Sequence, residues 1–174
     1  MPKGAWKEEK EAMYIRTVAR LSVIVVFSIC CGAQSQQTQT SACNFDDGKQ
    51  VSVRYQPDIS NHKLSEGKVW SPGGFPMLLF TSTPLDVSNS KIAIGAYSMY
   101  LIPQRDNWTL VLNKNVTPES KYDEHQDLLR VAMQEGQLSD PQPFQVIFAH
   151  VGPKQCNMRI YQAKTGIWTE FKEQ

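Results

Sequence analysis

Two neighbouring stretches decide the fold: GAYSMYLI at residues 95–102 and WTLVLN at residues 108–113. Alternate side chains share one face in each stretch, as they do along a β-strand. Tyr97 heads one such face in the first stretch and Trp108 heads one in the second, each followed by apolar residues two positions apart. A short polar turn at 103–107 separates the two stretches, so the pattern predicts a β-hairpin with both aromatic rings in the core.

The same two-residue alternation recurs on both sides of this hairpin. An Asp-Gly pair at residues 47–48 marks a further hairpin. Residues 82–90 are predicted as a turn region, and 121–126 as a turn or short helix. Short strands with Gly- and Pro-rich turns predict an all-β, mostly antiparallel β-sandwich, with a jelly-roll-like or barrel-like arrangement as the alternative. The other predicted strands are 51–55, 77–80, 129–133, 144–149, 158–161 and the short 167–168.

The N-terminal segment has the layout of a secretory signal peptide. An uncharged apolar run at residues 21–31 follows Arg16 and Arg20 and leads into small residues, with cleavage expected after Ala33. The run is too short to span a bilayer, which needs roughly 20 apolar residues. The alternative is a lipoprotein anchored at Cys30 or Cys31.

This segment divides the chain into three parts. We predict a signal peptide at 1–33, a Gln-, Ser- and Thr-rich flexible tether at 34–43, and a single β-sandwich domain at 44–174. Met1 and Met13 both remain open as the start. The mature domain is expected to be exported, as a periplasmic or secreted protein that meets a membrane only through its signal segment or a lipid anchor.

The charge of the chain argues against nucleic acid as a partner. The full sequence has 18 basic and 17 acidic residues, and the signal peptide takes five and three of them, which leaves 13 basic against 14 acidic. Neither a basic run nor an acidic tail is present. A nucleic-acid binder needs a concentrated positive surface.

Two cysteines, Cys43 and Cys156, remain after the signal peptide. In an oxidising compartment they are most simply a disulfide, which would join the first strand region to the last. The alternative is two separate buried thiols. Cysteines this far apart do not form a zinc signature.

The titratable residues give no clear catalytic pattern. His62, His125 and His150 have no partner at metal-ligand spacing, so neither a metal nor a cofactor is expected. Asp123 or Asp127 could orient His125 as a general base. The same cluster could instead cap and solvate a turn, with Arg130 pairing to Asp127 or Asp123. A Gly-x-Ser-x-Gly nucleophile motif is absent, and no catalytic residue is assigned.

Aromatic residues offer a second kind of site. Exposed rings on a β-sandwich can stack on sugar rings or on the apolar surface of a partner. Tyr100 and Tyr122 are the rings we expect to be exposed. The candidate ligand-binding residues are Trp70, Tyr100, Tyr122, His125 and Arg130, and the candidate partners are a glycan or a protein of the cell envelope.

Four segments in order resemble a bacterial exported family known as domain of unknown function 2911. They are GKVW at 67–70, GAYSMYLIP at 95–103, WTLVLNK at 108–114 and YDEHQDLLRV at 122–131. The resemblance covers most of residues 51–151. It implies a mostly antiparallel β domain exported from a Gram-negative-type cell, and it brings no established activity.

One departure from that family bears on function. After Gly-x-Val-Trp its members typically continue with Arg-Thr-Gly-Ala and then acidic or amide residues, whereas this chain has SPGGFP at 71–76. A polar site formed there in relatives would be lost or remodelled here. The sequence therefore favours a non-catalytic binding or structural module of the cell envelope. The alternative is a hydrolytic enzyme that uses Asp123, His125 and Asp127.

Overall fold

The computed structural model describes residues 37–57, 64–105, 107–117 and 121–174. The predicted signal peptide, the alternative lipid anchor and His62 lie outside the described residues. The described part of the chain contains no helix that is both long enough and apolar enough to cross a membrane.

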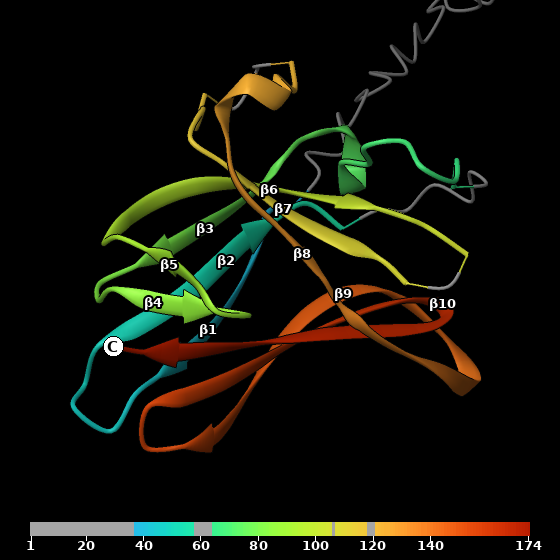
Figure 1. Ribbon diagram of the computed structural model, residues 1–174. Helices are drawn as coiled ribbons and strands as arrows, with labels where there is room; N and C mark the ends of the chain where they lie inside the picture. The colour runs from blue at the N-terminus through green and yellow to red at the C-terminus, as the bar shows by residue number, and fades with distance from the viewer. Residues whose placement is uncertain (1–36, 58–63, 106, 118–120) are drawn as a thin grey trace, which may run out of the picture. The chain divides into compact units, whose positions relative to one another are not determined.

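The chain folds into two antiparallel sheets, which confirms the predicted all-β class (Figure 1). One sheet has six strands in the order β1-β2-β3-β6-β7-β8, and the other has four in the order β5-β4-β10-β9. They do not close into a barrel. The strands are β1 Gln39–Asn44, β2 Gln50–Tyr55, β3 Met77–Thr81, β4 Leu85–Val87, β5 Ser90–Ile92, β6 Gly95–Ile102, β7 Thr109–Asn113, β8 Asp127–Ala132, β9 Gln134–Gly152 and β10 Gln155–Glu173, with short 3-10 turns at η1 Pro72–Gly74 and η2 Glu124–Gln126.

The predicted hairpin at 95–113 forms two interior strands of the six-stranded sheet. Strands β6 and β7 pair with Met99 opposite Leu112 and Leu101 opposite Leu110. These four side chains are fully buried, and Trp108 is buried with them, as the alternation predicts. Burying one leucine side chain contributes about 1.5–3 kcal/mol, so this strand pair is a main source of stability.

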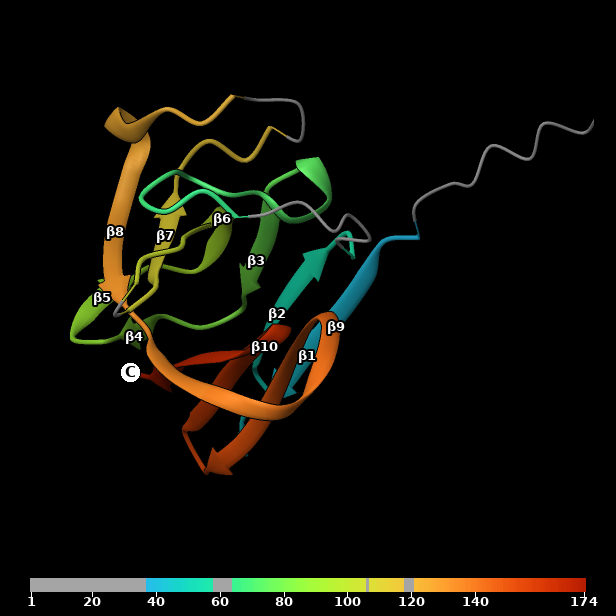
Figure 2. The same ribbon diagram turned by 90° about the vertical axis from the view of Figure 1, so that its right-hand side faces the viewer.

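Strands β9 and β10 form a ribbon of 19 residues on each side, much longer than the predicted segments at 144–149 and 158–161. The first half of β9 contains Gly136, Pro141 and Pro143. Strand β9 lies at the edge of its sheet, where a proline without an N–H group costs no ladder hydrogen bond. The register shifts between Tyr161 and Thr165, and the bulge bends the ribbon (Figure 2).

Two further segments differ from their predictions. Residues 39–43, predicted as tether, belong to β1 and pair along β2, so the folded domain begins earlier than residue 44. Residues 82–90, predicted as turn, contain β4 and the start of β5, joined by Ser88 and Asn89 with φ of 51° and 66°. β4 and β5 have only three residues each, which is too short to show a clear two-residue alternation in the sequence.

The predicted disulfide between Cys43 on β1 and Cys156 on β10 is present. It links the two sheets with a Cα–Cα distance of 6.3 Å, which is ordinary for such a bridge. A second link joins the same sheets: Lys49 Nζ lies 2.6 Å from Oε1 of Glu173, whose side chain is fully buried. The disulfide is consistent with an oxidising, exported location.

Candidate functional site

Two of the predicted site residues, Tyr122 and Arg130, meet around the carboxylate of Asp127. Tyr122 Oη donates to Asp127 Oδ2 at 2.7 Å, and Arg130 Nε donates to the same oxygen at 2.7 Å. Arg130 Nη2 also donates to Tyr122 Oη at 2.6 Å. The second carboxylate oxygen accepts from Asn113 Nδ2 at 2.8 Å, so both oxygens of Asp127 are occupied.

These contacts change the acidity of the phenol. Burial, and next the hydrogen bond to the Asp127 carboxylate, raise the pKa of Tyr122 to about 12. The hydrogen bond to Asp127 also raises the pKa of Arg130. Tyr122 and Arg130 therefore stay protonated near neutral pH. Their hydrogen bonds to Asp127 hold Tyr122 against the start of β8.

Tyr100 is not exposed, contrary to the prediction. Its side chain is 1% exposed and packs edge-on against Tyr122 with ring centroids 5.0 Å apart. It belongs to a small apolar cluster with Ile102 and Val111, partly covered by Val69. The outer face of the central strand β6 is covered by neighbouring loops, which two-residue alternation alone does not reveal.

Trp70 is partly buried and packs against the core. Its ring meets Trp108 at a centroid distance of 5.9 Å and Phe144 at 5.5 Å, both edge-on. Its backbone pairs with Leu101 across an isolated bridge. Trp70 therefore joins the hairpin at 95–113 to β9 and has little face left for stacking.

His125 lies on the surface beside an open hollow of about 450 Å³ that Arg130 also lines. Its backbone N–H donates to Asp123 Oδ1 at 3.0 Å, so this carboxylate caps η2 and does not orient the imidazole. Among the residues that the structure describes, no contact joins the His125 ring to a carboxylate. Nor do these residues contain a group of three or more His, Cys, Asp or Glu that could hold a metal ion.

A different hollow, which the sequence analysis did not find, lies on the β9–β10 ribbon. Gly136 and Gly166 pair directly across the two strands. A Cβ added to Gly136 would lie 3.2 Å from the six-membered ring of Trp168, and one added to Gly166 would lie 3.2 Å from the Tyr161 ring. The paired glycines thus leave room for two aromatic rings to lie on the ribbon.

Both rings line one hollow of about 440 Å³, which we call the aromatic groove. Tyr161 precedes the register shifts and Trp168 follows them, and both residues line the same space. Both are half-buried. Leu138 adds an apolar wall. The volume lies within the range of small-molecule sites, roughly 300–1,000 Å³.

Polar side chains complete the aromatic groove. Arg159 Nε donates to Asn157 Oδ1 at 3.0 Å, and both residues line the hollow. Arg159 is the one charged residue among the described residues of the lining, and it forms no ion pair within the described part of the chain. The groove can therefore offer stacking faces and guanidinium donors together.

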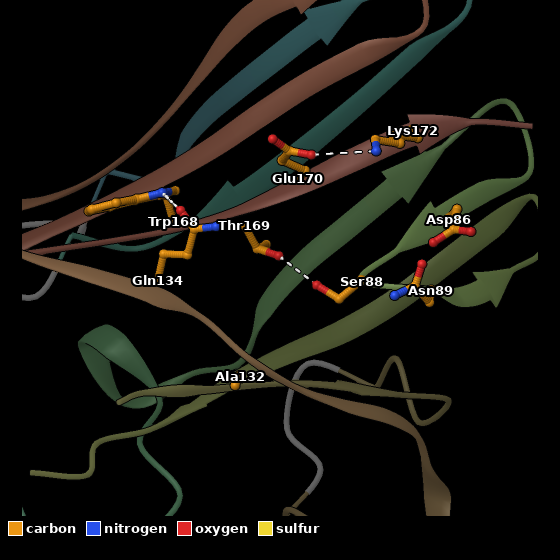
Figure 3. Close-up of a pocket in the computed structure, with 9 residues that line it drawn as sticks. All are labelled: Asp86, Ser88, Asn89, Ala132, Gln134, Trp168, Thr169, Glu170 and Lys172. Atoms are coloured by element: carbon orange, nitrogen blue, oxygen red, sulfur yellow. Dashed lines mark hydrogen bonds and ion pairs between the residues drawn. The ribbon is translucent and has the colours of Figure 1, made fainter. Parts of the chain in front are cut away.

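A second hollow of about 300 Å³ adjoins Trp168, and we call it the polar pocket (Figure 3). Its walls come from the β4–β5 turn, from the junction of β8 and β9, and from the last part of β10. Trp168 Nε1 donates to Gln134 Oε1, which fixes the indole between the two hollows. The remaining wall is hydrophilic, with Asp86, Ser88, Asn89, Glu170 and Lys172.

The sequence held one signal for the aromatic groove. Glycine inside a strand often marks a place where another group approaches closely, and Gly166 precedes Trp168 by two residues. The approach of Tyr161 to Gly166 depends on the bulge between them, which alternation does not predict. Arg159 gave no signal because an exposed arginine on a strand is common.

The described residues thus define an antiparallel β-sandwich with a disulfide between its two sheets. The family model described as "Protein of unknown function (DUF2911)" matches residues 35–170. The chain belongs to this family. No curated protein and no solved structure matches the chain.

Proposed function

We propose that this domain is a non-catalytic saccharide-binding module of an exported protein and that the aromatic groove is its binding site. The observation that carries the proposal is the pair of rings, Tyr161 and Trp168, held over a glycine pair in one hollow beside Arg159. A sugar ring has an apolar C–H face that fits a flat aromatic surface, and hydroxyl groups that need polar partners. The groove supplies both.

Other ligand classes fit the groove less well. A nucleic acid would need a basic track for its phosphates, whereas Arg159 stands alone in the lining. A purely apolar ligand would desolvate the Arg159 guanidinium without giving its remaining N–H groups an acceptor. The predicted signal peptide and the disulfide support an exported setting, periplasmic or secreted, where free saccharides and envelope glycans are present.

Hydrolysis by Asp123, His125 and Asp127 is the weaker candidate. Asp127 already accepts hydrogen bonds at both oxygens, and Asp123 caps η2. A general base needs a free acceptor that can reach the substrate proton. In the described contacts, these carboxylates stabilise η2 and the start of β8.

The test is binding of the mature domain to a panel of defined oligosaccharides, read by tryptophan fluorescence and by calorimetry. The panel contains neutral β-linked glucose and N-acetylglucosamine chains, uronic acid chains and mixed chains. We expect at least one member to bind. The variant Trp168→Ala should weaken its binding about tenfold or more, because a stacked ring contributes about 1.5 kcal/mol.

The matched control is Phe75→Ala, which removes an aromatic ring that is 43% exposed and lies outside the groove. This variant should bind like the parent protein. Thermal melting of both variants must show an intact fold. If no panel member binds, or if Phe75→Ala and Trp168→Ala have equal effects, the proposal is wrong.

A further inference from the structure

We infer that the aromatic groove and the polar pocket are two adjoining subsites for one saccharide chain, with an acidic sugar beside Arg159 and an uncharged sugar in the polar pocket. The inference rests on the proposed function and names the class of ligand: a chain in which acidic and neutral units alternate. It follows from the position of Trp168 and from the charges on its two sides.

Among the residues that the structure describes, Trp168 is the one that lines both hollows. Along β10, Arg159 and Tyr161 precede it on the groove side, and Glu170 and Lys172 follow it on the pocket side. A single side chain thus separates the two hollows, whose volumes are about 440 and 300 Å³. Two linked sugar rings can occupy them together, with the indole beneath or beside the linkage.

The aromatic groove favours a negative group. Arg159 uses Nε for Asn157, at 3.0 Å, and no carboxylate of the described residues forms an ion pair with it. A guanidinium with free N–H groups binds a carboxylate in a two-pronged geometry, which is among the stronger hydrogen-bonded pairs. A uronic acid that stacks on Tyr161 or Trp168 brings such a carboxylate to Arg159.

The polar pocket has the opposite preference. It contains the carboxylates of Asp86 and Glu170 against one ammonium group, Lys172, which is a formal net charge of −1. Lys172 lies 3.7 Å from Glu170 and pairs in register with Asp86 across the strands, so its charge is already matched. Carboxylates accept hydrogen bonds from sugar hydroxyls and repel a second acid group.

The β4–β5 turn gives the pocket a defined wall. Ser88 and Asn89 hold the turn in a left-handed conformation, and the Ser88 and Thr169 hydroxyl oxygens are 3.3 Å apart (Figure 3). The turn is thereby tied to β10 next to Trp168. The polar pocket thus offers hydroxyl, amide and carboxylate groups to the hydroxyl-rich, uncharged sugar proposed to lie in it.

The experiment compares three tetrasaccharides of equal length. They are a hyaluronan tetrasaccharide, in which glucuronate and N-acetylglucosamine alternate, a tetragalacturonate, in which every unit is acidic, and chitotetraose, which is neutral. We expect the alternating chain to bind at least tenfold more tightly than either of the others. Its binding should weaken with added salt, because the Arg159 contact is ionic.

Variants assign the preference to each hollow. Arg159→Gln should remove the advantage of the alternating chain over chitotetraose, while Arg105→Gln, on the β6–β7 turn, should leave it unchanged. Glu170→Gln should improve binding of tetragalacturonate several-fold, because one repelling charge disappears from the polar pocket. A two-unit chain should already reach most of the affinity of the four-unit chain.

The outcomes separate this inference from the proposed function. If all three chains bind equally and Trp168→Ala abolishes the binding, the two-subsite inference is overturned and the saccharide-binding proposal stands. If only the all-acidic or only the neutral chain binds, the charge assignment is overturned. Failure of every chain, including the wider panel, overturns both.

Discussion

The disulfide between Cys43 and Cys156 should contribute a large part of the stability of this domain. The cysteines are 113 residues apart, so the bridge closes most of the folded chain into one loop. In the chain-entropy treatment, a loop of this length removes about 16 cal/mol/K from the unfolded state, or about 5 kcal/mol at 25 °C. Domains of this size are stable by only about 5–15 kcal/mol.

The perturbation is the double variant Cys43→Ala/Cys156→Ala. Measured losses for removal of a native disulfide from a small exported domain are about 2–5 kcal/mol, and we expect the upper half of that range. Both sulfur atoms are buried, so their loss also leaves small packing defects. Urea unfolding followed by circular dichroism gives the free energy of unfolding by linear extrapolation.

Free energies must be compared and not only transition midpoints, because a cross-linked unfolded chain is more compact and its dependence on urea is smaller. The single variant Cys43→Ala is the control: it cannot form the bridge either, so its stability should match that of the double variant. A loss below about 1 kcal/mol in the double variant would refute the reasoning, as would free thiols at both positions in unreduced peptides.

Two further predictions concern the aromatic groove and the hydrogen-bonded cluster of Tyr122, Asp127 and Arg130. Gly136→Ala with Gly166→Ala should push both rings aside and weaken saccharide binding several-fold in the calorimetric assay, with a loss of stability of about 1–3 kcal/mol; Gly152→Ala, whose added Cβ meets nothing closer than 3.8 Å, should change neither. Folding raises the pKa of Tyr122 from 10.0 to about 12, so the unfolded chain loses this proton first and the free energy of unfolding should fall between pH 10 and 12. Tyr122→Phe should remove that part of the pH dependence, and an unchanged pH profile in the variant would contradict the assignment to Asp127 and its neighbours.

The fold was predictable where one face of a strand is buried and the other is not. Burial alternates along β2 and β3. The predicted hairpin at 95–113 is also confirmed, although most residues of β6 and β7 are buried on both faces. The disulfide was predictable because only two cysteines follow the predicted signal peptide. Exposed edge strands were not predictable: β1 and the first half of β9 carry few apolar residues, and their pairing depends on neighbours far away in sequence.

The candidate site could be predicted only in part. Tyr122, His125 and Arg130 do lie near one another, because they are close in sequence on both sides of η2. The exposure of Tyr100 was misjudged because it depends on loops that cover the outer face of the sheet. The aromatic groove needs a cross-strand glycine pair and a bulge together, and neither feature has a reliable signal in a single sequence.

The β9–β10 ribbon that forms the aromatic groove is held in place on both sides of its bulge. Its two halves lie on opposite sides of the bulge at 161–165, and a bend at this point would move Arg159 relative to Trp168. The first half is held at Cys156, next to Asn157 of the groove lining, by the disulfide to β1. The last half is held by pairing with β4 and by the buried Glu173 that binds Lys49. The disulfide and the Glu173–Lys49 contact both connect β10 to the β1–β2 hairpin. This hairpin therefore sets the angle between the two walls of the aromatic groove. Loss of the disulfide should weaken saccharide binding even in molecules that remain folded.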